Sequence, residues 1–109
     1  MKQMNLLQGT LDLLVMKALA AEARHGYGVV RWVRETTGGA FEIEDGALYT
    51  ALHRMKERGW LESKWGVSEA GRRAKFYTLT ARGRRQLAKE SEQWGRYTAA
   101  VGKILEADA

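Results

Sequence analysis

Apolar residues recur at the helical spacing of three and four positions in three segments of the first half of the chain. These segments predict helices over about Thr10–Ala21, Tyr27–Thr37 and Gly46–Arg58. Gly38 and Gly59 directly follow the second and third segments, where a glycine with left-handed backbone geometry commonly ends a helix. The chain contains no proline, so glycine marks the breaks between elements.

Polar and apolar residues indicate how these helices begin and which faces are turned inward. Thr10 and Asp45 are predicted to cap the first and third helices. The predicted inward face of the third helix consists of Leu48, Ala51, Leu52 and Met55. In the first helix, Leu13 and Met16 lie away from the main apolar face, which predicts that a second surface covers this helix.

Aromatic and β-branched residues in the second half predict two strands, Trp60–Val67 and Lys75–Leu79, joined by a polar connection that contains glycine. Two strands joined in this way form a β-hairpin. The alternation at Phe41–Ile43 predicts a further, very short strand. After Thr80, the pattern predicts a long final helix that continues toward Leu105.

Three short helices followed by a two-stranded hairpin is the winged helix-turn-helix arrangement. The predicted fold class is therefore mainly α with a small β-hairpin, a winged helix-turn-helix plus a long C-terminal helix. We expect residues 1–80 to form a winged-helix domain that binds DNA, and residues 81–109 to form a dimerisation helix. Fold class does not fix function, so this expectation depends on the surfaces.

The last helix carries a heptad pattern. Two sets of residues spaced by seven alternate by four and three, as in the seam of a coiled coil, and they are Leu87, Ser91, Trp94, Thr98, Val101 and Leu105. A helix this long cannot bury its whole stripe against a small domain. We therefore expect two copies of the chain to pair through this seam and through Leu13 and Met16. The alternative is that the seam packs back on the first helix of its own chain.

Positive charge is concentrated in one part of the chain. The chain has 18 basic and 13 acidic residues and a net charge of +5. The stretch 64–85 holds seven basic residues and a single acidic one, Glu69, so its net charge is +6 and the remainder is near neutral. Such a patch suits a polyanion such as DNA. Three of its arginines oppose the dipole of the last helix, a cost that phosphate contact or ion pairing would offset: Arg82, Arg84 and Arg85.

The outward face of the third helix can donate hydrogen bonds and would fit a major groove. The candidate DNA-reading residues on it are Tyr49, Thr50, His53 and Arg54. The hairpin supplies the candidate phosphate-binding residues Lys64, Arg72, Arg73 and Lys75. Against DNA binding, Glu42, Glu44 and Asp45 precede or begin the third helix and repel phosphate. These acids favour the alternative that the winged helix binds protein instead of DNA.

Enzymatic, metal-binding and secretory functions find little support. The chain has no cysteine, and its two histidines, His25 and His53, lack metal-ligand spacing. It has no phosphate-binding glycine loop or nucleophile elbow, so we expect no catalytic residue, metal or cofactor. Asp12 and Lys17 interrupt the apolar stretch near the N-terminus, which is too short for a signal peptide. We expect a cytoplasmic protein with no membrane partner.

Several motifs in order along the chain resemble the PadR family of bacterial transcriptional regulators. They cover essentially the whole chain and are Leu7–Leu14, His25–Gly28, Gly46–Met55, Gly59–Leu61, Arg72–Tyr77 and Leu79–Gly83. The single C-terminal helix resembles the smaller PadR subgroup. The sequence departs from the family pattern at Thr50, where proline is usual, and at Ala47, where serine or threonine is usual. Ala47 lacks a hydroxyl that would contact phosphate.

The resemblance implies a sequence-specific transcriptional regulator that represses its target as a homodimer on an inverted-repeat operator. It implies that Tyr27, Tyr49 and the basic residues of the wing meet double-stranded DNA. It also implies that some members respond to a small aromatic or cationic effector that weakens DNA binding.

Trp94 is the candidate effector contact. It lies mid-seam beside the small residues Ser91 and Thr98, so space is expected next to a flat aromatic wall. Ligand-responsive members of the resembled family similarly place an aromatic residue on this helix. The alternative is that Trp94 only fills the interface by packing on Leu13 or Met16.

Overall fold

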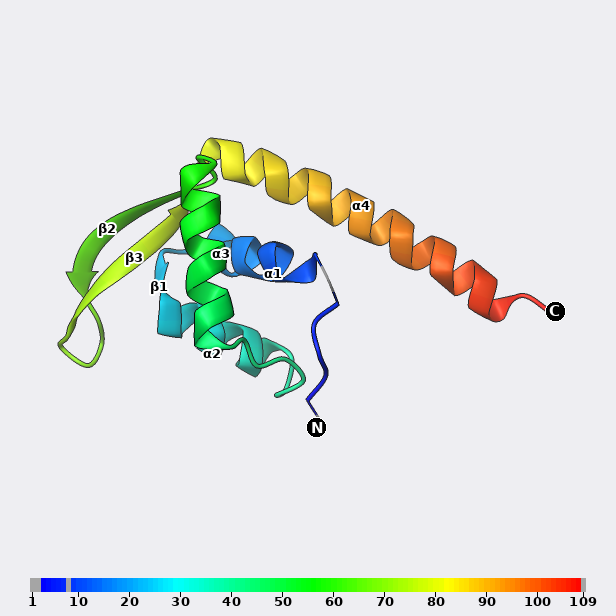
Figure 1. The fold of residues 1–109 in the computed structure, drawn as a ribbon, viewed down its shortest axis with the longest axis horizontal. Helices are drawn as coiled ribbons and strands as arrows, with labels where there is room; N and C mark the ends of the chain where they lie inside the picture. Colours follow the sequence, from blue (N-terminus) through cyan, green and yellow to red (C-terminus); the bar gives the residue numbers. More distant parts are fainter. Residues whose placement is uncertain (1–2, 8, 109) are drawn as a thin grey trace.

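A computed structural model describes residues 3–7 and 9–108. Its elements are α1 (Thr10–Ala21), β1 (Arg24–His25), α2 (Gly26–Thr36), α3 (Asp45–Glu57), β2 (Leu61–Val67), β3 (Arg73–Leu79) and α4 (Ala81–Glu106). This order confirms the predicted fold class, and each predicted helix agrees within about one residue at either end. Figure 1 shows the hairpin of β2 and β3, the wing, at one end of the molecule and the free end of α4 at the other.

The sheet has the order β1-β3-β2, and both of its strand pairs are antiparallel. The strand predicted at Phe41–Ile43 is wrong, because this segment has no partner strand and runs extended into α3. Ile43 is buried in the core, and Phe41 packs against it with partial exposure. The third strand is instead β1, whose Arg24 pairs with Tyr77. Two residues are too few to reveal a strand by alternation.

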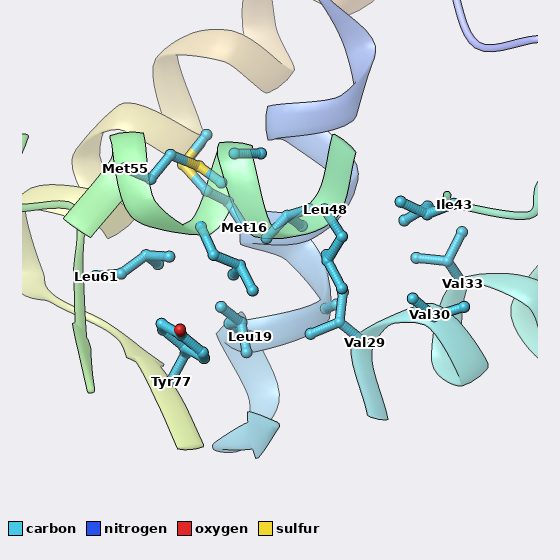
Figure 2. Packing of buried hydrophobic residues seen from close by; sticks show 14 of the residues in the cluster. Met16, Leu19, Val29, Val30, Val33, Ile43, Leu48, Met55, Leu61 and Tyr77 are labelled. Atoms are coloured by element: carbon cyan, nitrogen blue, oxygen red, sulfur yellow. The ribbon is translucent and has the colours of Figure 1, made fainter. Parts of the chain in front are cut away.

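The core lies where α1, α2 and α3 meet the base of the sheet. Its largest buried side chains come from all of these elements and include Met16, Leu19, Val29, Val33, Leu48, Leu52, Met55 and Leu61 (Figure 2). The predicted inward face of α3 is confirmed in full, because its four residues are buried. Tyr77 and Leu79 of β3 close the core on the sheet side.

Met16 does not face a second chain. It was predicted, with Leu13, to form part of a dimer surface, but its side chain is fully buried in the core of its own chain. The physical reason is that α1 is covered by α2, α3, β3 and α4 together, so more than one stripe of this helix is buried. Leu13 remains partly exposed.

Two predicted caps are also wrong. Gly9 is the N-cap of α1, and the Thr10 hydroxyl donates to the Leu7 carbonyl 2.7 Å away. Asp45 is the first residue of α3, and its N-cap, Glu44, makes no side-chain capping hydrogen bond. The caps that do form are His25 on α2 and Thr80 on α4, each accepting a backbone N–H at 3.0 Å.

The first half of α4 lies beside the rest of the chain, and its second half extends away from it. Leu87 lies against the core, and Arg84 donates to the Ala20 carbonyl at the end of α1, 3.1 Å away. That contact places a cation at a helix C-terminus, where the dipole favours it. From Ser91 to Leu105 every α4 residue except Gly102 is exposed, and Figure 1 shows this part extending past α1. No helix in the described part of the chain has the length and hydrophobicity to cross a bilayer.

Candidate nucleic-acid interface

The outward face of α3 presents three of the predicted DNA-reading residues. Tyr49, Thr50 and His53 are all exposed. The His53 Nε2 atom lies 3.1 Å from the Glu57 carboxylate one turn later, so the imidazole is directed along the helix surface. These three side chains form one polar face on the helix that the hairpin follows.

Arg54 does not belong to this face. Its guanidinium donates to the carboxylate of Asp12 on α1, an ion pair in which Asp12 is mostly buried. The side chain therefore joins α3 to α1, and the structure does not group it with the other three predicted DNA-reading residues. The two residues are 42 positions apart, so a helical wheel of α3 could not reveal their contact.

Tyr27 and Tyr49 stand together although they come from different helices. The Tyr49 ring lies against Gly26, where an added Cβ would be 2.6 Å from the Tyr49 hydroxyl oxygen. Tyr27, the next residue, stacks on His25 with ring centroids 6.4 Å apart. Gly26 thus lets α3 approach the start of α2 closely, and both phenol rings stay more than half exposed.

The wing supplies the opposite wall of a cleft. A hollow of about 510 Å³, the wing cleft, is lined mainly by Tyr27, Tyr49, Trp65, Arg73 and Lys75. Trp65 was not among the predicted site residues. The signal that could have identified it is its position in the predicted hairpin, where pairing of the two strands places it directly opposite Lys75.

The four predicted phosphate-binding residues divide between two sides of the wing. Successive strand residues point to opposite faces. Lys75 pairs with Trp65 and faces the wing cleft, whereas Lys64 pairs with Phe76 on the other face. Arg73 lines the wing cleft as well, and Arg72 borders it at the hairpin tip. The structure thus brings Arg72, Arg73 and Lys75 together and leaves Lys64 apart.

One of the acidic residues that argued against DNA binding is neutralised. The Glu42 carboxylate lies 3.1 Å from the Arg34 guanidinium. The neighbouring Tyr27 hydroxyl and then the charge of Glu42 raise the pKa of Arg34 above its ordinary value. Glu44 and Asp45 are exposed and form no ion pair within residues 3–7 and 9–108.

The free part of α4 exposes more apolar residues than the sequence pattern indicated. Of the predicted seam, Leu87 packs on the chain's own core, and the residues from Ser91 onward are exposed. Tyr97 and Ile104 are 63% and 76% exposed and were missed. They follow Trp94 and Val101 by three positions, so a second seam of alternating three and four runs beside the predicted one.

A second hollow, of about 500 Å³, lies between α1 and α4 and is lined by Leu13, Glu90, Trp94 and Tyr97, among others. Trp94 and Tyr97 stack with ring centroids 6.3 Å apart. The Glu90 Oε2 atom is buried and has no hydrogen-bond partner among the described residues. Burial, followed by the nearby charge of Asp12, raises the pKa of Glu90 above its ordinary value, partly offset by Gln86, Arg58 and Lys89.

Comparison with known proteins agrees with this arrangement. Residues 15–89 match the transcriptional regulator PadR-like family. A PadR family transcriptional regulator from Eggerthella lenta is 32% identical, with 93% of this chain and 86% of that chain covered and a TM-score of 0.79. One from Clostridium difficile is 27% identical, with coverages of 89% and 99% and a TM-score of 0.77. A transcriptional regulator from Clostridium thermocellum shares the fold, with 23% identity, coverages of 91% and 96% and a TM-score of 0.82.

Proposed function

Because this chain belongs to the transcriptional regulator PadR-like family, we propose that it represses transcription by binding an inverted-repeat DNA operator as a homodimer. Its family makes it a DNA-binding transcription regulator and not an enzyme, as predicted. The observation that carries the proposal is the wing cleft, where exposed tyrosines of α2 and α3 face the cations of the wing. That surface combines groups able to read bases with groups able to neutralise phosphates.

In the proposed complex, α3 enters the major groove with Tyr49, Thr50 and His53 toward the bases. Phosphates of one DNA strand are bound by Arg72, Arg73 and Lys75. Tyr27, at the start of α2, contacts the same DNA strand. Arg72, Arg73 and Lys75 have no carboxylate within ion-pairing distance in residues 3–7 and 9–108, which leaves their charges available to DNA. Residues 1–80 then form the DNA-binding domain.

The proposed dimer forms through residues 81–109. Its support is the stripe of exposed Trp94, Tyr97, Val101 and Ile104 along the part of α4 that extends from the core. Two such helices would bury each other's stripes, with Ser91, Thr98 and Leu105 at their margin and Leu13 nearby. A two-fold dimer places two copies of α3 on half-sites about one helical turn apart, which requires an inverted repeat.

The test is binding of purified full-length chain to a duplex selected from random DNA, with the same duplex scrambled as the comparison. We expect an inverted repeat to be selected and the logarithm of affinity to fall steeply with the logarithm of salt concentration. Arg72→Ala should weaken binding to both duplexes equally. Tyr49→Ala should weaken binding to the selected duplex more than to the scrambled one.

Binding that does not change between low and physiological salt would contradict the proposal. It would instead support a winged helix that binds protein, the alternative favoured by the exposed carboxylates of Glu44 and Asp45. Equal losses on both duplexes for Tyr49→Ala would remove the base-reading role assigned to α3.

We further propose that Trp94 contacts a small aromatic or cationic effector in the hollow between α1 and α4. The support is a stacked aromatic pair, Trp94 and Tyr97, beside the Glu90 carboxyl in a space of about 500 Å³. Planar cationic dyes should quench tryptophan fluorescence saturably, and Trp94→Ala should abolish this response while the dimer persists. Quenching that persists in Trp94→Ala would place any effector elsewhere. A monomeric Trp94→Ala would show that the dimer needs this side chain, and the lost response would then not identify an effector contact.

A further inference from the structure

Trp65 is an unusual residue to find on the surface of a small sheet. Its indole is 55% exposed, on the strand face that continues outward from buried Tyr77 and Leu79. Two cations lie against it. The Arg73 guanidinium carbon is 4.3 Å and the Lys75 Nζ atom 5.4 Å from the ring centroid, both within the range of cation–π attraction.

The register of the hairpin explains this arrangement. Trp65 lies directly opposite Lys75, and Arg73 is two residues from Lys75, so all three share one face. Like charges this close repel each other, and no carboxylate within residues 3–7 and 9–108 pairs with either cation. The electron-rich face of the indole is therefore the group that holds both cations on this side of the wing.

The same face forms one wall of the wing cleft, and Tyr27 and Tyr49 form the other. When α3 occupies a major groove and the wing reaches the neighbouring minor groove, one strand of the duplex must pass between them. The negative charges of that strand then meet the side of the cleft that carries Arg73 and Lys75.

We propose that Trp65 is a positioning residue of the DNA interface. It fixes Arg73 and Lys75 in the wing cleft so that both contact the sugar–phosphate backbone passing between α3 and the wing. This role rests on the proposed function, since it requires that α3 and the wing bind one duplex. Without the ring, the two cations repel and disperse into solvent, and each loses a defined phosphate contact.

The test compares full-length Trp65→Ala, Trp65→Leu and Trp65→Phe with the parent chain on one selected duplex across a range of salt concentrations. Each phosphate contact contributes about 0.9 to the slope of log affinity against log salt. We expect the slope to become shallower by about 2 to 4 for Ala and Leu, because each substitution occurs twice in the proposed dimer, and to return toward the parent value for Phe. Leu keeps apolar bulk but has no aromatic face, so it separates packing from cation–π attraction.

Val67→Ala is the matched control. Val67 is exposed on the same face and lies directly opposite Arg73 in the hairpin, but its side chain has no aromatic ring. Its slope should equal that of the parent. In a chain that already carries Arg73→Ala and Lys75→Ala, Trp65→Ala should leave the slope unchanged.

A parent-like slope for folded Trp65→Ala and Trp65→Leu, with a shallower slope for the Arg73→Ala and Lys75→Ala variant, would overturn the positioning role and leave the proposed function standing. Failure of Trp65→Phe to restore the slope would overturn it as well. If the parent chain itself binds DNA without salt dependence, the proposed function fails and this inference fails with it.

Discussion

Gly83→Ala is expected to lower the free energy of unfolding by about 3 kcal/mol, near the upper end for overpacked substitutions. A Cβ at this position would lie 2.2 Å from the carbonyl oxygen of Trp60 and 2.6 Å from Leu79 Cδ1. The first obstacle is backbone, which cannot rotate away as a side chain can. The start of α4 would have to move away from the turn that joins α3 to β2.

That movement would break a local network. The Thr80 N–H donates to the Trp60 carbonyl at 3.0 Å, and the Thr80 hydroxyl lies 2.7 Å from the Gly59 carbonyl oxygen and caps α4. These bonds join the end of α3 to the corner between β3 and α4. Displacing α4 therefore weakens its cap and the turn at Gly59 together, a loss that adds to the steric cost.

Thermal unfolding at fixed protein concentration measures the effect, since the melting temperature of a dimer depends on concentration. For a chain of this size we expect a decrease of roughly 10 °C or more. Gly46→Ala is the control, because Gly46 also lies in the first turn of a helix and its added Cβ meets nothing closer than a Glu44 side-chain oxygen at 3.8 Å. It should stabilise the chain by about 0.5 to 1 kcal/mol. Equal melting temperatures for the two variants would contradict the close approach at Gly83.

The fold followed from periodicity because each main element is long enough to show one. The inward face of α3 and the ends of the helices at Gly38 and Gly59 were predicted correctly, and these glycines have φ values of 59° and 78°. β1 was missed because two residues carry no period. Met16 was assigned to the dimer surface because the apolar pattern of one helix does not show how many other elements of the chain cover that helix.

The site was harder to predict because its contacts join distant parts of the chain. Helical geometry placed Tyr49, Thr50 and His53 on one face, and the structure agrees. Arg54 is bound to Asp12, a partner that only the tertiary fold brings near. Lys64 was grouped with Lys75 by sequence distance, although strand alternation and the hairpin register place them on opposite faces.

We expect Val101→Glu to convert the proposed homodimer into monomers and to weaken binding to a two-half-site operator by at least a hundredfold. Val101 is shared by both candidate seams of α4, so its role does not depend on which seam pairs. In a two-fold interface every substitution occurs twice, and each new carboxylate would be buried opposite apolar surface. Loss of the dimer also removes the effective concentration that links the two half-site contacts, which contributes about 10² to 10⁴ in affinity.

The measurements are sedimentation equilibrium for mass and DNA titration with duplexes that carry one or two half-sites. Ala99→Glu is the matched control, because it adds the same carboxylate to an exposed position on the opposite side of the same turn. It should remain dimeric and bind normally. Binding to a single half-site should be unchanged in both variants, since no α4 residue lines the wing cleft and the free end of α4 lies at the other end of the molecule (Figure 1). A dimeric Val101→Glu would show that α4 does not form the interface.

Two further variants identify the seam. Ile104 and Leu105 are both exposed apolar residues at the same level of α4, but they lie about 100° apart around the helix. If the seam is Trp94, Tyr97, Val101 and Ile104, Ile104→Glu weakens the dimer much more than Leu105→Glu. If it is the seam predicted from the sequence, which runs through Thr98 to Leu105, the order reverses. We expect the first result, because that seam has a large aromatic or branched apolar side chain at all four positions, whereas the other places the small, hydroxyl-bearing Thr98 between Trp94 and Val101.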